Sequence, residues 1–93
     1  MTDTEIQYQE VISGCRSLFS KKAHDYGSVW RILRLPSLTD QIFIKAQRLR
    51  TIEDKGVQKV NDQRELEYVG IVNYCLMALI QIRKGVSNEA DLN

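Results

Sequence analysis

The sequence has few of the residues that mark common catalytic and metal sites. Its 93 residues include one histidine and two cysteines, and Cys15 and Cys75 stand far apart, with no CxxC spacing. We expect both cysteines to be reduced, small core residues of a cytoplasmic protein, where a disulfide is rare. The chain also has no glycine-rich phosphate loop, zinc-ligand spacing or Ser-His-Asp order. No common enzyme signature therefore names a catalytic residue.

Strong charge and long apolar runs are missing as well. The formal net charge of +1 argues against extended nucleic-acid binding, which needs a basic excess. No apolar run reaches the roughly 20 residues that cross a bilayer, and the polar, acidic start is no signal peptide. A chain this short buries only about two-thirds of its unfolded surface, so we expect a small core that a partner chain helps to complete.

The apolar spacing that is present predicts an all-α fold, a helical bundle of three long helices with a short connecting turn. The first helix should begin near residues 2–4 and run to about His24, with Thr2 and Glu5 as its capping box and Gly27 as its stop. A connection over residues 28–36 should hold one helical turn, with Leu35 extended because a proline follows it.

The second and third helices have their own end signals. Ser37 is a suitable N-cap with Asp40 three residues later, so the second helix should run from there to Lys55 and stop at Gly56. The third should begin at residue 61 or 62 and stop at Gly85. We expect residues 1–85 to form one helical domain and residues 86–93 to form a flexible tail or the start of a linker.

Apolar residues reveal which helix is central. The third helix is apolar almost all round over residues 69–82, which is typical of a helix between two others. Phe43 and Ile44 fall off the apolar stripe of the second helix, which predicts a second contact surface there. A polar sector on the third helix is either its solvent side or a semi-buried pocket wall, and it consists of Glu67, Gly70, Asn73, Tyr74, Met77 and Gln81.

Two cations on the second helix are candidates for anion binding. Lys45 falls about 30° from the centre of the apolar stripe, at 100° per residue, so it needs a partner. Asp25, Glu67 or a ligand phosphate would each supply one. Arg48 lies about 60° from Lys45 and could join it in holding an anion. Lys22 also lies in an apolar stripe, where it either extends to solvent or meets an anion.

A cluster of charged and aromatic residues follows the first helix. His24 at a helix end either interacts with the helix dipole or takes part in catalysis. Trp30 either fills the core or stacks on a base. With Asp25, Tyr26 and Arg31, these residues stand within eight positions. A turn needs fewer charged and aromatic residues than these, so we expect this segment to form one wall of a binding site.

These elements together resemble the nucleotide modification associated domain, type 1, a helical family of bacteria and phages without a known biochemical function. The resemblance covers residues 6–84 and rests on His24-Asp25-Tyr26-Gly27, on Asp40 with Lys45 and Arg48, and on Asn73-Tyr74. It implies a link to nucleotide or DNA-base modification. It also implies a distant similarity to the MazG-type nucleotide pyrophosphohydrolases, which hold magnesium on a triphosphate with carboxylates.

The resemblance also assigns roles. Many relatives have an aspartate where this chain has Gly70, which removes a metal ligand but leaves nucleotide binding open. The chain resembles the first unit of a tandem member, so a second repeat or a second copy would complete it. The implied ligand-binding residues are Lys22, Asp25, Tyr26, Trp30, Arg31, Lys45, Arg48, Asn73 and Tyr74. The implied ligands of a magnesium ion are Asp40 and Glu67.

Two functions therefore follow as hypotheses. The first is a domain that binds a nucleotide or another phosphate-containing small molecule in a polar pocket between the helices. The second is a non-catalytic helical module, whose off-stripe Phe43 and Ile44 drive dimerisation. Nucleotide-dependent stabilisation would favour the first hypothesis. Loss of a dimer on Phe43→Glu, without any effect of nucleotides, would favour the second.

Overall fold

The computed structural model describes residues 1–26, 31, 33–55 and 61–85, apart from the side chains of residues 24–26, 61 and 62. These residues form three α-helices, α1 (Asp3–Tyr26), α2 (Leu35–Lys55) and α3 (Asn61–Arg83), and contain no strand. The all-α class with three long helices is confirmed. The predicted helix stops at Gly27 and Gly56 and the tail over residues 86–93 lie outside the described residues. So do residues 28–30 and 32 of the predicted helical turn.

The predicted capping box of α1 is confirmed. The backbone N–H of Thr2 donates to Glu5 Oε2 at 2.8 Å, and the backbone N–H of Glu5 donates to Thr2 Oγ1 at 3.1 Å. Asp3 and Glu5 also place negative charge in the first turn, where the helix dipole favours it. The helix then extends to Tyr26, two residues past the predicted end.

The start of α2 differs from the prediction. The helix begins at Leu35, and the carbonyl of Arg34 accepts hydrogen bonds from the N–H groups of Ser37 (3.0 Å) and Leu38 (3.4 Å). Proline suits this first turn because the N–H that it lacks would have no acceptor inside the helix. The predicted extended Leu35 and the Ser37 cap are therefore wrong, and Asp40 lies within the helix.

The predicted end of α3 is confirmed at Gly85. Gly85 has a φ of 80°, in the left-handed region that glycine adopts readily, and its N–H donates to the carbonyl of Ile82 at 3.0 Å. The N–H of Lys84 donates to the carbonyl of Ile80, also at 3.0 Å. The chain thus closes α3 with the turn that its sequence predicts.

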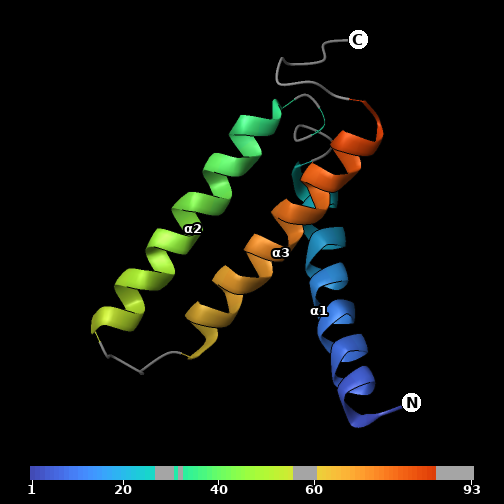
Figure 1. The fold of residues 1–93 in the computed structure, drawn as a ribbon, viewed down its shortest axis with the longest axis vertical. Coiled ribbons are helices and arrows are strands. Elements are labelled where there is room, and N and C mark those ends of the chain that lie inside the picture. The colour runs from blue at the N-terminus through green and yellow to red at the C-terminus, as the bar shows by residue number, and fades with distance from the viewer. Residues whose placement is uncertain (27–30, 32, 56–60, 86–93) are drawn as a thin grey trace.

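The central helix is α3, as its apolar character predicts. Figure 1 shows α3 packed along α2 on one side and crossing α1 on the other, with α1 spreading away toward the N-terminus. The buried apolar residues are Leu38 and Leu49 on α2 and Cys15 on α1. The three helices therefore form an open arrangement with a small core.

Exposure corrects two further expectations. Cys75 is exposed, because its part of α3 is not covered, whereas Cys15 is buried and both thiols are free. The segment Gln63–Arg83 of α3 is long enough to cross a bilayer and has a mean hydropathy of 1.2. The sequence has no unbroken apolar run of this length, but the mean hydropathy of the segment is high although polar residues interrupt it. Only 17% of that apolar window is buried within the structure, so α1 and α2 leave most of it uncovered.

Candidate functional site

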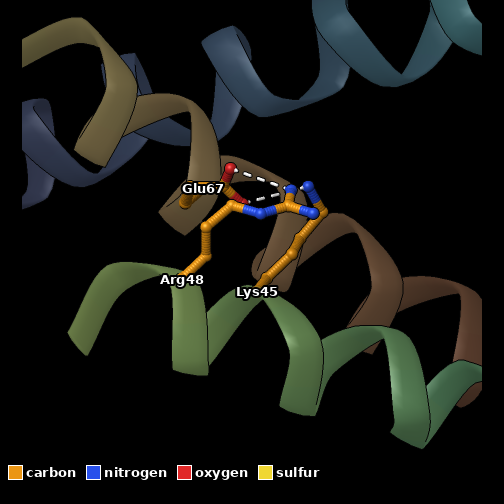
Figure 2. A network of polar contacts seen from close by, with 3 residues as sticks. All are labelled: Lys45, Arg48 and Glu67. Carbon is orange, nitrogen blue, oxygen red and sulfur yellow. Dashed lines mark hydrogen bonds and ion pairs between the residues drawn. The ribbon is translucent and has the colours of Figure 1, made fainter. Parts of the chain in front are cut away.

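A three-residue ion cluster joins α2 to α3. Lys45 Nζ donates to Glu67 Oε2 and Arg48 Nη1 donates to Glu67 Oε1, each at 3.2 Å (Figure 2). The side chains of Lys45 and Glu67 are only 17% and 14% exposed, whereas that of Arg48 is 57% exposed. Of the three partners predicted for Lys45, Glu67 is the one that the structure shows. Two cations on one carboxylate leave the cluster with a net positive charge.

Gly70 makes room for Lys45. A Cβ atom at Gly70 would lie 2.7 Å from Lys45 Cε and 2.9 Å from Lys45 Cδ, closer than such atoms approach. The lysine side chain therefore fills the hollow that the missing side chain leaves one turn after Glu67. Gly70 therefore leaves room for Lys45, and the lysine side chain would have to shift if a larger residue stood here.

The two cations control the pKa of Glu67. Burial raises the pKa of its carboxyl, but the hydrogen bonds from Lys45 and Arg48, together with their positive charges, outweigh burial. The pKa of Glu67 consequently lies below its ordinary value of 4.5. At neutral pH the carboxylate is ionised and both of its oxygens accept a hydrogen bond from a cation.

An open groove of about 390 Å³ adjoins the cluster between α2 and α3. It combines cationic, polar and apolar side chains, and its lining is Arg48, Thr51, Ile52, Lys55, Gln63, Leu66 and Glu67. The two helix dipoles oppose each other here, since α2 ends and α3 begins beside the groove, so the side chains decide its charge. Arg48 and Lys55 outnumber Glu67, which makes the groove favourable for an anion.

The polar sector of α3 faces its neighbours rather than solvent. Asn73 is buried, and its Nδ2 donates to the carbonyl of Cys15 on α1 at 3.1 Å, while its Oδ1 has no hydrogen-bond partner. Gln81 is buried too, and its Nε2 donates to the carbonyl of Arg31 at 2.6 Å. The sector is therefore semi-buried, as one interpretation predicted. Its members hold different neighbours: Glu67 contacts α2, Asn73 contacts α1 and Gln81 contacts the segment between them.

The other predicted site residues lie in varied settings. Lys22, Arg31 and Asp40 are exposed and Tyr74 is half-buried. Trp30 and the side chains of Asp25 and Tyr26 lie outside the described residues, so the expected pairing of Asp25 with Lys45 or Arg48 stays a prediction.

The implied magnesium ligands do not form a metal site together. Within the described residues no group of three or more His, Cys, Asp or Glu side chains could hold a metal. Glu67 is already neutralised by two cations, and Asp40 is exposed. The residues described here thus do not fit the ion on their own, and the metal role of Asp40 and Glu67 stays a prediction.

Sequence reasoning missed five members of the groove, the polar Thr51, Lys55 and Gln63 and the apolar Ile52 and Leu66. Lys55 was interpreted only as the end of a helix, although it falls seven residues, and thus two turns, after Arg48. That spacing places both cations on one side of α2 and was the signal available in the sequence.

The fold and the ion cluster define a small all-helical domain with an anion-compatible groove. The family described as nucleotide modification associated domain 1 matches residues 22–82, about two-thirds of the chain. The chain belongs to this family, which confirms the resemblance found in the sequence. No curated protein and no solved structure matches the chain, so the similarity to MazG-type enzymes stays a prediction.

Proposed function

We propose that the chain binds a nucleotide, or another phosphate-containing small molecule, in the groove between α2 and α3. The observation that carries this proposal is the net positive charge of the Lys45–Glu67–Arg48 cluster beside an open groove. Membership of a family associated with nucleotide modification supports this ligand class. The proposal concerns binding and includes no catalytic step.

Each side chain has a distinct part in the proposed binding. Arg48 uses Nη1 for Glu67, and its exposed guanidinium has further N–H donors for phosphate oxygens. Lys55 adds a second cation, and Ile52 and Leu66 give an apolar surface for a base. Lys45 acts indirectly, because its hydrogen bond to Glu67 fixes the carboxylate that orients Arg48.

A binding experiment tests this proposal. The purified chain is titrated by calorimetry with nucleoside monophosphates, nucleoside triphosphates and inorganic phosphate, with and without magnesium. Arg48→Ala should weaken binding about 10- to 100-fold, the value of one hydrogen bond between charged groups. Arg50→Ala is the matched control, because this exposed arginine lies about 200° around the same helix.

The outcomes separate specific from general binding. A nucleotide that binds the native state should also raise the melting temperature, by an amount that grows with its concentration. Equal weakening by Arg48→Ala and Arg50→Ala would reduce the interaction to general electrostatic attraction. Absence of binding for every nucleotide and for phosphate would refute the proposal.

The second candidate is a non-catalytic helical interaction module, and exposed apolar side chains favour it. Phe43 is 63% exposed and Ile44 is 45% exposed on α2, as the sequence pattern predicted. If this face drives dimerisation, Phe43→Glu should convert a dimer to a monomer in sedimentation equilibrium. A dimer that Phe43→Glu leaves intact would exclude this face as the interface.

A further inference from the structure

The N-terminal half of α1 exposes an apolar and acidic surface. Tyr8 and Val11 are 63% and 62% exposed, although they belong to the apolar stripe that packs on α3 farther along the helix. Residues 3–15 contain three acidic residues, Asp3, Glu5 and Glu10, and no lysine or arginine. This half of the helix therefore offers apolar side chains flanked by negative charge.

A complementary surface lies at the other half of α1. A groove of about 360 Å³ runs between α1 and α3, and its walls are apolar apart from one amide and two arginines: Ile12, Arg16, Phe19, Asn73, Leu76, Leu79, Ile80 and Arg83. Arg16 and Arg83 are exposed, and neither forms an ion pair within the described part of the chain. This groove thus offers an apolar surface flanked by positive charge.

The two complementary surfaces cannot meet within one chain. Both lie on α1, a continuous helix from Asp3 to Tyr26, which cannot fold back on itself. At 1.5 Å per residue, Glu5 and Arg16 are separated by about 16 Å along the helix axis. Only another copy of the chain can bring the acidic half of α1 to the basic groove.

We propose that two copies of the chain associate through antiparallel α1 helices about a twofold axis near Val11. Glu5 and Arg16 are eleven residues apart, so they lie about 20° apart around the axis, on one flank of α1. An antiparallel pair centred between them sets Glu5 of each copy against Arg16 of the other. The interface is isologous: the same surface patch of each copy contacts the other, so association stops at a dimer.

An exposed apolar side chain beside the acidic flank supports a second copy as the occupant. Tyr8 is 63% exposed and follows Glu5 by three residues, so it lies about 60° from Glu5 around α1. A second α1 helix that brings its Arg16 to Glu5 would therefore also cover Tyr8.

This interface lies on α1 and is distinct both from the face of α2 that exposes Phe43 and Ile44 and from the groove between α2 and α3. The family matches residues 22–82, so the acidic half of α1 lies outside the matched span.

Reciprocal charge reversal tests the proposal by sedimentation equilibrium of the 93-residue chain. The chain should be a dimer, and Glu5→Arg and Arg16→Glu should each raise the dissociation constant at least tenfold. An equimolar mixture of these two variants should restore dimers, because both contacts regain opposite charges. Thr2→Ala is the matched control for Glu5→Arg, since it breaks the same capping box without reversing a charge. Circular dichroism confirms that each variant is helical.

Three outcomes would overturn this interface. A wild-type chain that is monomeric at 100 μM-scale concentrations, of the order of a weak Kd, would exclude it. A mixture of the two variants that remains monomeric would exclude the predicted pairing. A dimer that is lost in Phe43→Glu but kept in both α1 variants would move the interface to α2, which leaves the second candidate function standing. Nucleotide binding is measured separately and depends on Arg48.

Discussion

At the scale of single residues, Glu67 balances the charges between α2 and α3. Its carboxylate is largely buried and accepts one hydrogen bond from Lys45 and one from Arg48. A partly buried lysine without its partner would keep the cost of desolvation and lose the compensating contact. Lys45 therefore depends on Glu67 more than the exposed Arg48 does.

The lowered pKa of Glu67 predicts how its contribution to stability varies with pH. Because the folded pKa lies below 4.5, the contribution is complete above the unfolded pKa and is lost as pH falls through the folded pKa. Glu67→Gln should lower the free energy of unfolding by about 1–3 kcal/mol at pH 7. The difference from wild type should shrink below pH 4.5 in urea denaturation.

Glu65→Gln is the control for that measurement, since Glu65 is exposed two residues earlier on the same helix. Its effect should stay within about 0.5 kcal/mol. A difference between wild type and Glu67→Gln that is constant from pH 7 to pH 3 would contradict the role of the ion cluster.

Two helical glycines form a natural comparison. Gly14→Ala should stabilise the monomer by about 0.5–1 kcal/mol, because alanine favours helix and nothing lies near the new Cβ atom. Gly70→Ala has the same intrinsic gain, but the Lys45 side chain must shift to make room for the new Cβ atom. We therefore expect Gly70→Ala to be the less stable variant when both are unfolded in urea at a concentration that keeps the chain monomeric. Equal stabilisation by the two substitutions would show that Lys45 moves at no cost.

At the scale of the helices, α3 holds its neighbours with different chemistry. Apolar side chains and the ion cluster join it to α2, whereas the buried amide of Asn73 reaches the backbone of α1. Gln81 holds the carbonyl of Arg31, which lies between the other two helices. The polar residues of an otherwise apolar helix thus determine where its neighbours sit.

Removal of an amide should loosen one neighbour selectively. Asn73→Ala should cost about 1–2 kcal/mol through loss of the hydrogen bond to the Cys15 carbonyl. The effect should be local. A thiol reagent should modify the Cys15 thiol faster, because α1, which carries Cys15, no longer packs closely on α3. Cys75, already exposed, is the internal reference, and its rate should not change. Unchanged protection of Cys15 would show that apolar packing alone positions α1.

Much of the helix structure could be predicted from the sequence, because helix starts and stops depend on residues that are close together in the chain. The capping box at Thr2 and Glu5 and the stop at Gly85 follow from fixed spacings. The need of Lys45 for a partner follows from its place in the apolar stripe, whereas the choice of Glu67 among three candidate partners does not. The start of α2 was mispredicted because Pro36 was interpreted as a barrier, whereas the first turn of a helix accepts it. Lys55 was missed because periodicity does not show which polar residues share a groove.

At the scale of the whole molecule, the open arrangement could not be predicted from the same patterns. Periodicity identifies the apolar face of a helix but not the neighbour that covers it. Tyr8 and Cys15 are seven residues apart and so fall on one face of α1, yet Cys15 is buried and Tyr8 is exposed. The difference arises because α1 diverges from α3 toward its N-terminus (Figure 1). Whether a second copy covers that end is decided by the charge-reversal experiment.

The central position of α3 has a consequence for the order of folding. α2 and α3 are neighbours in the chain and share the more extensive contact, so they can form a helical hairpin before α1 docks. In the monomer, α1 should then unfold as a separate unit with a lower free energy. Hydrogen exchange should replace amide protons of α1 before those of α2 and α3, whereas simultaneous exchange would indicate a single cooperative unit. The helix that the proposed dimer would order is thus the one that the monomer holds least firmly.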